Sequence, residues 1–134
     1  MSGKVVHFEI PYDDGERARR FYKEAFDWQL QEMPGMEYTL VVSGPSSDTG
    51  PSGDRGPTEP GYINGGMLAR EESAASGPVV VMDVPSIDEA LQTVERLGGS
   101  TVVPKQPVGG MGFTAYVKDP EGNVIGLWET APQA

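Results

Sequence analysis

The predicted elements of secondary structure occur in the same order twice along the chain. When His7 is aligned with Val79, the apolar positions of one predicted helix fall on those of a second. The matched pairs are Ala18 with Ala90, Tyr22 with Val94 and Ala25 with Leu97. A duplication of this kind copies a whole supersecondary unit. We therefore expect a single domain over residues 1–134 that consists of two βαβββ units, at about residues 4–70 and 78–130.

The first half begins with a strand whose side chains alternate between two faces. This strand is expected from Lys4 to Ile10 and ends at Pro11. Its apolar face consists of Val6, Phe8 and Ile10, and its mixed face of Val5, His7 and Glu9. Asp13 or Asp14 can cap the helix expected over residues 15–28, where the apolar residues have helical spacing. The pattern predicts an amphipathic helix packed on a sheet.

The remainder of the first half predicts three strands and one long loop. Strands are expected at residues 28–33 and 36–43, on either side of a Pro-Gly turn, and at residues 62–70. Residues 44–61 are almost wholly Gly, Pro, Ser, Thr and acidic residues, which is typical of a surface loop. Because the second half has no counterpart to this loop, we expect it to be mobile and dispensable for folding.

The second half repeats the pattern with shorter connections. A strand is expected at residues 79–84, and Ser86 with Glu89 three residues later forms a capping box for the next helix. Gly98 is a suitable stop for that helix. A short strand at residues 101–103 and a loop at residues 105–112 are expected to follow.

The segment Phe113–Glu129 predicts a β-hairpin. Its turn, Asp119–Asn123, contains a proline that fixes an early φ, followed by Gly122 and Asn123, which tolerate a positive φ. In the second arm Gly126 and Trp128 share a face, because strand side chains alternate. A glycine in the middle of a strand marks a bulge or a close approach to the backbone.

Composition excludes several classes of function. The 134 residues carry a formal net charge of −10, which argues against nucleic acids and anionic membranes as partners. The absence of cysteine excludes disulfides, thiolate metal sites and cysteine nucleophiles. No apolar run has the length of about 18 to 20 residues that spans a bilayer, and no signal-like N-terminus is present. We therefore expect a cytoplasmic protein.

Three segments resemble the vicinal oxygen chelate superfamily, which includes glyoxalase I, bleomycin and fosfomycin resistance proteins and extradiol dioxygenases. They are VVHFEI at residues 5–10, the D-x-E-R-A-x-x-F-Y-K-E-x-F pattern of residues 14–26, and DPEGNVIGLWE at residues 119–129. The resemblance implies an α+β fold in which tandem βαβββ units form curled mixed sheets around a concave cavity. It also implies a homodimer, because a second chain commonly completes the cavity.

The resemblance also implies where a metal would be held. Metal-dependent members supply four ligands, from the first and last strands of each unit. Carried over by position, these are His7, Gly65 or Gly66, Val79 and Gly126, so that one of the four can bind a cation. A divalent ion needs three or four nitrogen or oxygen ligands. We therefore expect no bound metal or other cofactor, and room for a bulkier organic ligand at the glycine positions.

His7 has two interpretations. A lone histidine on a strand is more often a hydrogen-bonded structural residue than a catalyst. However, the resemblance places His7 and Glu9 on the cavity face, where a glutamate beside a histidine can assist proton transfer. His7 is thus the one candidate catalytic residue. The candidate ligand-binding residues are His7, Glu9, Gly66, Gly126 and Trp128, and His7, Glu9 and Trp128 are expected to line one pocket. Tyr38, Phe113 and Tyr116 are assigned to the core.

Two functions remain open at this stage. The first is a metal-free protein that binds or sequesters a small organic molecule, which the loss of ligand residues favours. The second is an enzyme of the lyase, isomerase or dioxygenase type that recruits a divalent metal in an unexpected way.

Overall fold

The computed structural model describes residues 3–35, 37–46 and 56–132. The chain divides into two compact units: one comprises His7–Pro78, and the other comprises Val79–Ala134 with the N-terminal residues Met1–Val6. The elements follow the order β-α-β-β-β twice, with a short 3-10 helix, Arg70–Glu72, between the two sets. The fold class is α+β, as the duplicated sequence pattern predicts.

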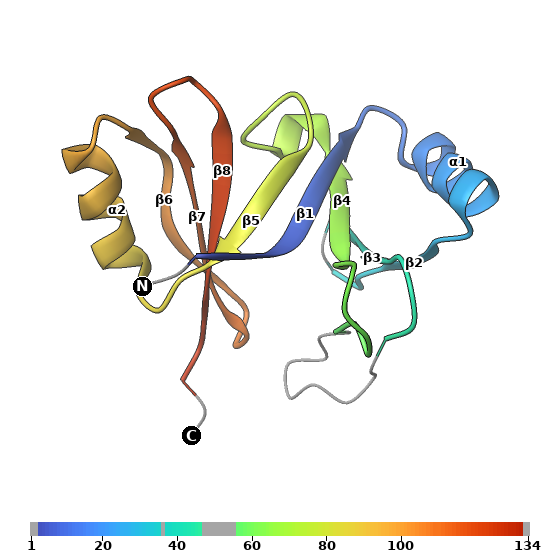
Figure 1. The fold of residues 1–134 in the computed structure, drawn as a ribbon. Coiled ribbons are helices and arrows are strands. Elements are labelled where there is room, and N and C mark those ends of the chain that lie inside the picture. The colour runs from blue at the N-terminus through green and yellow to red at the C-terminus, as the bar shows by residue number, and fades with distance from the viewer. Residues whose placement is uncertain (1–2, 36, 47–55, 133–134) are drawn as a thin grey trace. The chain divides into compact units, whose positions relative to one another are not determined.

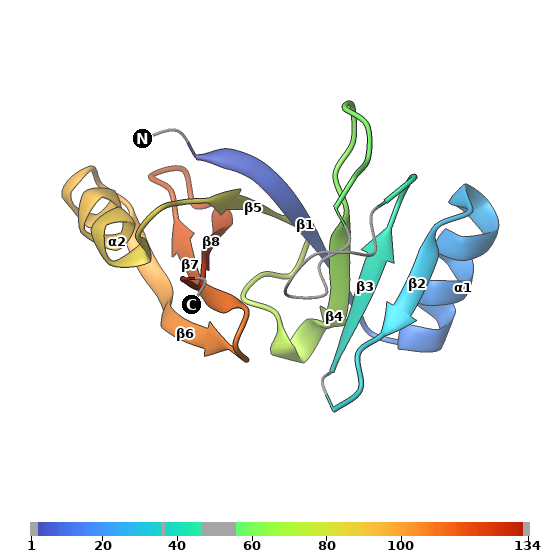
Figure 2. The same ribbon diagram turned by 90° about the horizontal axis from the view of Figure 1, so that it is seen from below.

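The unit His7–Pro78 consists of four strands and one helix (Figure 1). The elements are β1 (Lys4–Tyr12), which belongs to this unit from His7 onward, α1 (Gly15–Phe26), β2 (Gln29–Glu32), β3 (Tyr38–Val42) and β4 (Gly65–Ala69). The strands are ordered β2-β3-β4-β1, with β1 parallel to β4 and the other pairs antiparallel. Figure 2 shows α1 beside β2. The order places β4 between β1 and β3, which matters for the site.

The second unit has the same topology. Its elements are β5 (Val79–Asp83), α2 (Ile87–Arg96), β6 (Ser100–Val108), β7 (Gly112–Lys118) and β8 (Val124–Thr130). The strands are ordered β5-β8-β7-β6, and α2 packs on one face of the sheet. The buried core between them consists of Val84, Ile87, Ala90, Ala115, Val117 and Leu127. Leu127 therefore faces α2, and its neighbours Gly126 and Trp128 face the other way.

The helix boundaries follow from their caps. The side chain of Asp14 accepts a hydrogen bond from the Arg17 N–H at 3.1 Å and begins α1. Asp27 ends it in the left-handed conformation, with φ 60°. Ser86 accepts from the Glu89 N–H at 3.2 Å and begins α2, so the predicted capping residue is confirmed.

The turn between β7 and β8 is organised by one carboxylate. Asp119 accepts hydrogen bonds from the backbone N–H groups of Glu121 and Asn123, each at 2.9 Å, and from the Asn123 side chain at 3.0 Å. Above all the side-chain hydrogen bond from Asn123 holds the pKa of Asp119 below its usual value. Gly122 has φ 88°, as expected, but Asn123 does not take a positive φ. Asn123 instead acts through its side chain and its N–H.

Two predicted boundaries are wrong, and both involve proline. Strand β1 continues through Pro11, which pairs with Leu68, to Tyr12. Strand β6 extends to Val108, so that much of the expected loop at residues 105–112 is strand. Pro104 and Pro107 are tolerated in β6 because it is an edge strand of the sheet, so backbone groups on its outer side do not pair with another strand.

The expected buried stripe of the first helix is also wrong. No residue of α1 is buried, and Phe21 and Phe26 are 56% and 60% exposed. Val6, assigned to the apolar face of the first strand, is 41% exposed. In contrast, α2 buries Ile87 and Ala90 as its pattern predicts.

The expected loop over residues 44–61 is described only at its two ends. Ser46 and Pro57 form an isolated β-bridge, and Thr58 N–H donates to the Pro45 carbonyl at 3.0 Å. Residues 47–55, and with them most of the predicted loop, lie outside the described residues, as does Met36 in the expected second hairpin.

In the described ranges, the two α-helices have 12 and 10 residues, and neither is long or apolar enough to cross a bilayer.

Candidate functional site

The polar face of β1 points away from helix α1. Phe8 lies 5.7 Å from the ring of Trp28, which stacks at 4.7 Å on Tyr22 of α1, so Phe8 faces the helix. Its neighbours His7 and Glu9 therefore project from the other face. Glu9 is only 8% exposed and His7 is half-buried. A buried carboxylate requires hydrogen-bonding partners.

Tyr38 connects these two side chains. Its hydroxyl lies 2.7 Å from His7 Nε2 and donates to the Glu9 carboxylate at 3.2 Å. The phenol has a single proton, so while it donates to Glu9 it accepts from His7, which places a proton on Nε2. The rings of His7 and Tyr38 also lie nearly parallel, with an interplanar angle of 15°. An imidazole, a phenol and a carboxylate thus form one hydrogen-bonded group.

Gly66 allows Tyr38 to reach that group. Tyr38 is on β3, His7 and Glu9 are on β1, and β4 runs between these strands. Gly66 of β4 pairs with Glu9 on one side and with Leu40 on the other. A Cβ at position 66 would overlap the phenolic end of Tyr38. The tyrosine ring therefore crosses β4 over a glycine, and a side chain at position 66 would block it.

A comparable arrangement occurs in the other unit. Gly126 is in register with Tyr116 of β7 and Val81 of β5. A Cβ at position 126 would lie 3.3 Å from Tyr116 Cε1 and 2.9 Å from Val81 Cγ2. Both glycines of the expected ligand positions therefore have a tyrosine ring beside them.

Trp128 lies on the same face as Gly126 and is half-buried. Its ring covers Gly112 of β7, where a Cβ would be 2.7 Å from Trp128 Cζ2. Its indole N–H donates to the Thr130 hydroxyl at 3.1 Å. These contacts fix the ring and leave part of it exposed.

Of the predicted site residues, the structure gathers His7, Glu9 and Gly66 around Tyr38, in the unit His7–Pro78. Gly126 and Trp128 belong to the other unit. That His7, Glu9 and Trp128 line one pocket stays a prediction. Sequence reasoning missed Tyr38 and Tyr116 as residues of these faces. The available signal was a glycine within the last strand of each unit, Gly66 in β4 and Gly126 in β8, which permits an aromatic ring on a neighbouring strand to lie over the backbone.

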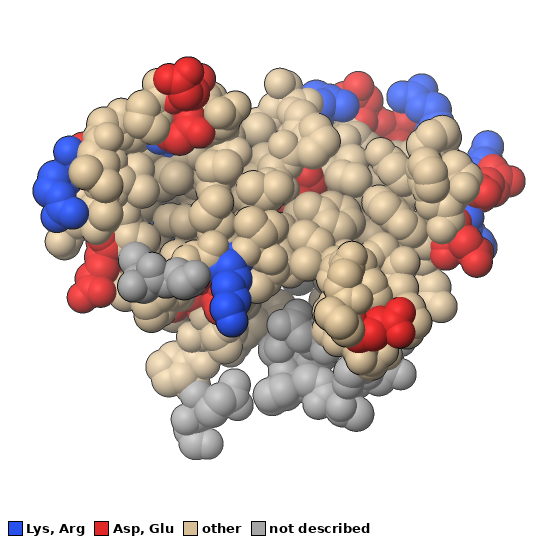
Figure 3. Space-filling model, in the orientation of Figure 1, with Lys and Arg blue, Asp and Glu red and all other residues tan. Residues whose placement is uncertain are grey.

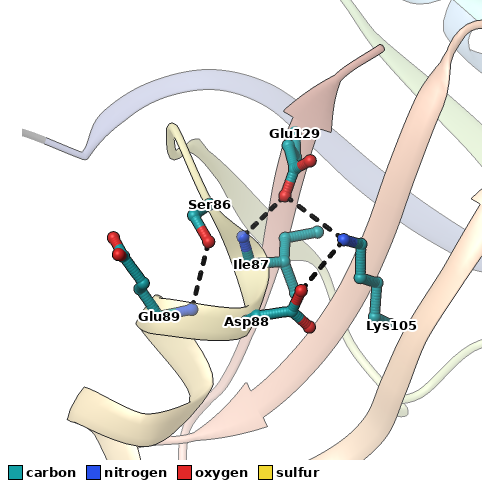
Figure 4. Close-up of polar contacts among 6 residues, drawn as sticks. All are labelled: Ser86, Ile87, Asp88, Glu89, Lys105 and Glu129. Carbon is teal, nitrogen blue, oxygen red and sulfur yellow. Dashed lines mark hydrogen bonds and ion pairs between the residues drawn. The ribbon is translucent and has the colours of Figure 1, made fainter. Parts of the chain in front are cut away.

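Glu129 has a structural role on the opposite face, as its alternation relative to Gly126 predicts. Figure 4 shows its carboxylate at the first turn of α2, where it accepts the Ile87 N–H at 2.8 Å. Lys105 lies 3.7 Å from this carboxylate and 3.2 Å from Asp88. Glu129 therefore caps α2 together with Ser86.

The residues at the metal positions that the family resemblance implies do not fit a divalent ion. Val79 is a buried aliphatic residue, and the space beside Gly66 and Gly126 is taken by tyrosine rings. Among the described residues, no three His, Asp or Glu side chains are grouped so that they could hold a metal. His7 and Glu9 remain as possible metal ligands, and both already contact the Tyr38 hydroxyl.

A hollow of about 390 Å³ lies near the start of α1, and Tyr38 is among the residues that line it. Its lining includes Arg19 and the carboxylates of Asp14, Glu16, Glu32 and Glu37. The Arg19 guanidinium lies 3.4 Å from the Thr39 hydroxyl and 3.5 Å from Glu32, which itself is largely exposed. This hollow is an alternative location for a ligand, and Arg19 is the residue through which it can be tested.

Comparison with known proteins supports the fold along the whole chain. Residues 4–44 match the family described as bleomycin resistance protein-like N-terminal. None of the curated proteins matches the sequence.

Three solved structures illustrate the similarity. A hypothetical protein from Bacillus halodurans C-125 has a TM-score of 0.62 at 18% identity, with 100% of this chain and 99% of that chain covered. A glyoxalase/bleomycin resistance protein/dioxygenase superfamily member from Vibrio splendidus 12B01 has a TM-score of 0.60 at 15% identity, with 96% of this chain and 99% of that chain covered. Methylmalonyl-CoA epimerase from Mycobacterium tuberculosis has a TM-score of 0.60 at 17% identity, with 98% of this chain and 93% of that chain covered.

At these identities the likeness to solved structures is one of fold. The matched family and the motifs at both ends of the chain agree with it. The protein thus shares its fold with a glyoxalase/bleomycin resistance protein/dioxygenase superfamily member and with methylmalonyl-CoA epimerase, and its residues 4–44 match the bleomycin resistance protein-like N-terminal family.

Proposed function

We propose that the protein binds a small organic molecule without the help of a metal, through the sheet face that carries His7, Tyr38 and Glu9. The observation that carries this proposal is the Tyr38 hydroxyl, held between an imidazole and a buried carboxylate beside Gly66. The family resemblance implies that His7 and Gly65 or Gly66 stand at ligand positions of metal-dependent members. The group is polar, pre-organised and only partly buried.

The chemistry of this group limits the kind of ligand. It combines a carboxylate that only accepts hydrogen bonds with a phenol and an imidazole that can donate or accept. A ligand that carries a hydroxyl, amide or amine is therefore favoured over an anion, because a second carboxylate beside Glu9 would be repelled. The formal net charge of −10 favours the same choice.

The experiment is a thermal-shift screen followed by calorimetric titration of the hits. Aromatic antibiotics that carry amine or hydroxyl groups form a suitable panel, with thiol conjugates and acyl-CoA thioesters as anionic comparisons, tested on protein purified without chelator and again after chelation. Binding that survives chelation supports the proposal. Binding that requires a stoichiometric metal contradicts it.

Variants then locate the ligand. Tyr38→Phe removes the hydroxyl and keeps the ring, so we expect it to weaken binding by about 1–3 kcal/mol. Tyr22→Phe, on the helix side of the same unit, is the matched control and should leave affinity unchanged. A ligand sensitive to Arg19→Ala and insensitive to Tyr38→Phe would occupy the hollow near α1 and overturn the proposed location.

An enzyme of the lyase or isomerase type is the second candidate. The fold is similar to that of methylmalonyl-CoA epimerase, and a phenol between an imidazole and a carboxylate can pass a proton between them. A bound ligand incubated in heavy water tests this candidate directly. Deuterium uptake that Tyr38→Phe slows would favour the enzyme, whereas binding without exchange or turnover, with and without added divalent metals, would favour the binding protein.

A further inference from the structure

One asparagine of the chain is followed by a glycine. Asparagine occurs at positions 64 and 123, and of these only Asn64 precedes a glycine, Gly65. Because glycine has no side chain to hinder the approach, its deprotonated backbone nitrogen can attack the side-chain carbonyl carbon of the asparagine. A carbon–nitrogen bond forms, ammonia leaves, and water opens the resulting five-membered imide. The product at position 64 is then either aspartate or isoaspartate.

The sheet requires the glycine of this pair. Gly65 is buried in β4, where it pairs with Phe8 of β1 and with Val41 of β3. A Cβ at position 65 would overlap both the carbonyl oxygen and the ring of Phe8. Any other residue would therefore push β1 away from β4. The reactive neighbour of Asn64 is thus imposed by the packing of the two strands.

The amide group of Asn64 is held by two serines, and we refer to Ser43, Ser46 and Asn64 together as the loop base. Asn64 Oδ1 accepts the Ser43 N–H at 2.9 Å, and Asn64 Nδ2 donates to Ser46 Oγ at 2.8 Å. Asn64 is 8% exposed. For the ring to close, the amide has to turn from both serines towards the Gly65 nitrogen, and Gly65 has to leave its strand pairing. The hydrogen bonds of the loop base therefore oppose the reaction.

We propose that Asn64 is a deamidation site whose reaction the loop base suppresses in the folded chain. The reaction proceeds when the loop base opens locally, so its rate follows the fraction of molecules that are open. It needs water and a deprotonated backbone nitrogen, and no enzyme or cofactor. The proposal does not depend on the ligand that the protein binds.

Deamidation at this position would damage the strand that carries Gly66. A carboxylate at position 64 cannot donate to Ser46, and it places a negative charge where Asn64 is almost buried. Isoaspartate also adds one atom to the main chain directly before Gly65. Because Gly66 is the next residue and the ring of Tyr38 passes over it, the longer backbone disturbs the register on which the Tyr38 contacts depend. The modified protein should therefore be less stable.

The test is incubation of the full chain in mildly alkaline buffer, with and without denaturing urea. The chain already has a formal net charge of −10, with acidic side chains at several places on the face shown in Figure 3, and each deamidation adds one negative charge. Anion exchange therefore separates the product, and peptide mass analysis identifies the modified residue. We expect Asn64 to react at least about tenfold more slowly in the folded protein than in urea.

Asn123 is the internal control for this experiment. Asn123 is followed by Val124, whose branched side chain hinders attack by the backbone nitrogen, so it should stay unmodified in both conditions. The deamidated fraction, once purified, should have a lower thermal midpoint than the unmodified protein. A fraction with the same midpoint would overturn the inferred damage to β4.

Two serine variants show whether the loop base is what protects Asn64. Ser46→Ala removes the acceptor of the Asn64 amide and should raise the rate in the folded protein about two- to tenfold. Ser86→Ala is the matched control, because it removes a side-chain hydrogen bond in the other unit and should leave the rate unchanged. Thermal midpoints establish that both variants are folded. Absence of reaction at Asn64 in urea, equal rates with and without urea, or equal acceleration in the two variants would each overturn the proposal.

Discussion

The hydroxyl of Tyr38 lies 2.7 Å from Nε2 of His7, although the strands of these two residues are not neighbours. The contact exists because the intervening strand carries Gly66, over which the tyrosine ring passes. The same ring places its hydroxyl 3.2 Å from Glu9. One backbone position without a side chain thus determines whether the three polar groups meet.

Gly66→Ala tests that relationship. The added methyl group would overlap the phenolic end of Tyr38, so the ring must move away from His7 and Glu9. We expect a loss of about 1–3 kcal/mol in the free energy of unfolding, from urea titration. Gly77→Ala is the control, because a Cβ at that position meets nothing within 4 Å. Equal stability of the two variants would show that Tyr38 does not depend on Gly66.

Tyr38→Phe separates the hydroxyl from the ring. The variant keeps the packing over Gly66 but removes the donor to the Glu9 carboxylate, which is 8% exposed. We expect a loss of about 1–3 kcal/mol in the free energy of unfolding, because a buried acceptor loses this hydrogen bond. If stability is unchanged or increased, other contacts of Glu9 satisfy its carboxylate without Tyr38.

The sequence predicts the order of the elements well because their signals are local. The helix cap at Ser86 and the turn at Asp119 each depend on residues close in the chain, and each is present in the structure. The prolines of β1 and β6 misplace two boundaries because a proline ends a strand only where its nitrogen must donate. Whether a hydrogen bond is needed from that nitrogen depends on which strands lie beside it, and local sequence patterns do not specify the neighbouring strands.

The candidate site was harder to predict because it depends on pairing between distant strands. The period of two places His7 and Glu9 on one face. It does not reveal that Tyr38 crosses β4, because that contact needs the register of Gly66 with both Glu9 and Leu40. Tyr38 had the pattern of a core residue, and its hydroxyl acquires a role only once that register is known.

Asp119→Asn should make the stability less dependent on pH in the acid range. The hydrogen bonds from Asn123 and Glu121 hold the pKa of Asp119 below its usual value in the folded state. A carboxylate with a lowered pKa stabilises the fold above its unfolded pKa, and that stability is lost as the pH falls through the folded value. We therefore expect the difference in unfolding free energy between wild type and variant to be largest near neutral pH and to shrink below about pH 4. A difference that is constant with pH would mean that the carboxylate charge does not matter in this turn.

Glu129→Ala should destabilise the first turn of α2. The carboxylate accepts the Ile87 N–H at 2.8 Å, and its loss leaves that donor without this partner. We expect a cost of about 0.5–2 kcal/mol in the free energy of unfolding, in the range of other helix caps. Lys105→Met, which removes a partly exposed ion-pair partner, should cost less than about 1 kcal/mol. If Lys105→Met costs more than Glu129→Ala, the ion pairs rather than the cap hold this turn.

The last prediction concerns ligand binding by the two faces. Trp128 is fixed by Gly112 and Thr130 and exposes part of its ring, so Trp128→Ala should weaken a ligand that contacts it by about 1–3 kcal/mol while the fold survives. His7→Ala should weaken a ligand bound at the His7 face by about 1–2 kcal/mol if the imidazole makes a hydrogen bond to it, and should leave affinity intact if His7 only positions Tyr38. Comparing His7→Ala with Tyr38→Phe distinguishes these roles, because a positioning role makes the tyrosine variant the more severe. Titration calorimetry of one ligand against the folded variants provides the measurement. Affinity unchanged by substitution of His7, Glu9 and Trp128 alike would exclude both faces as the binding site.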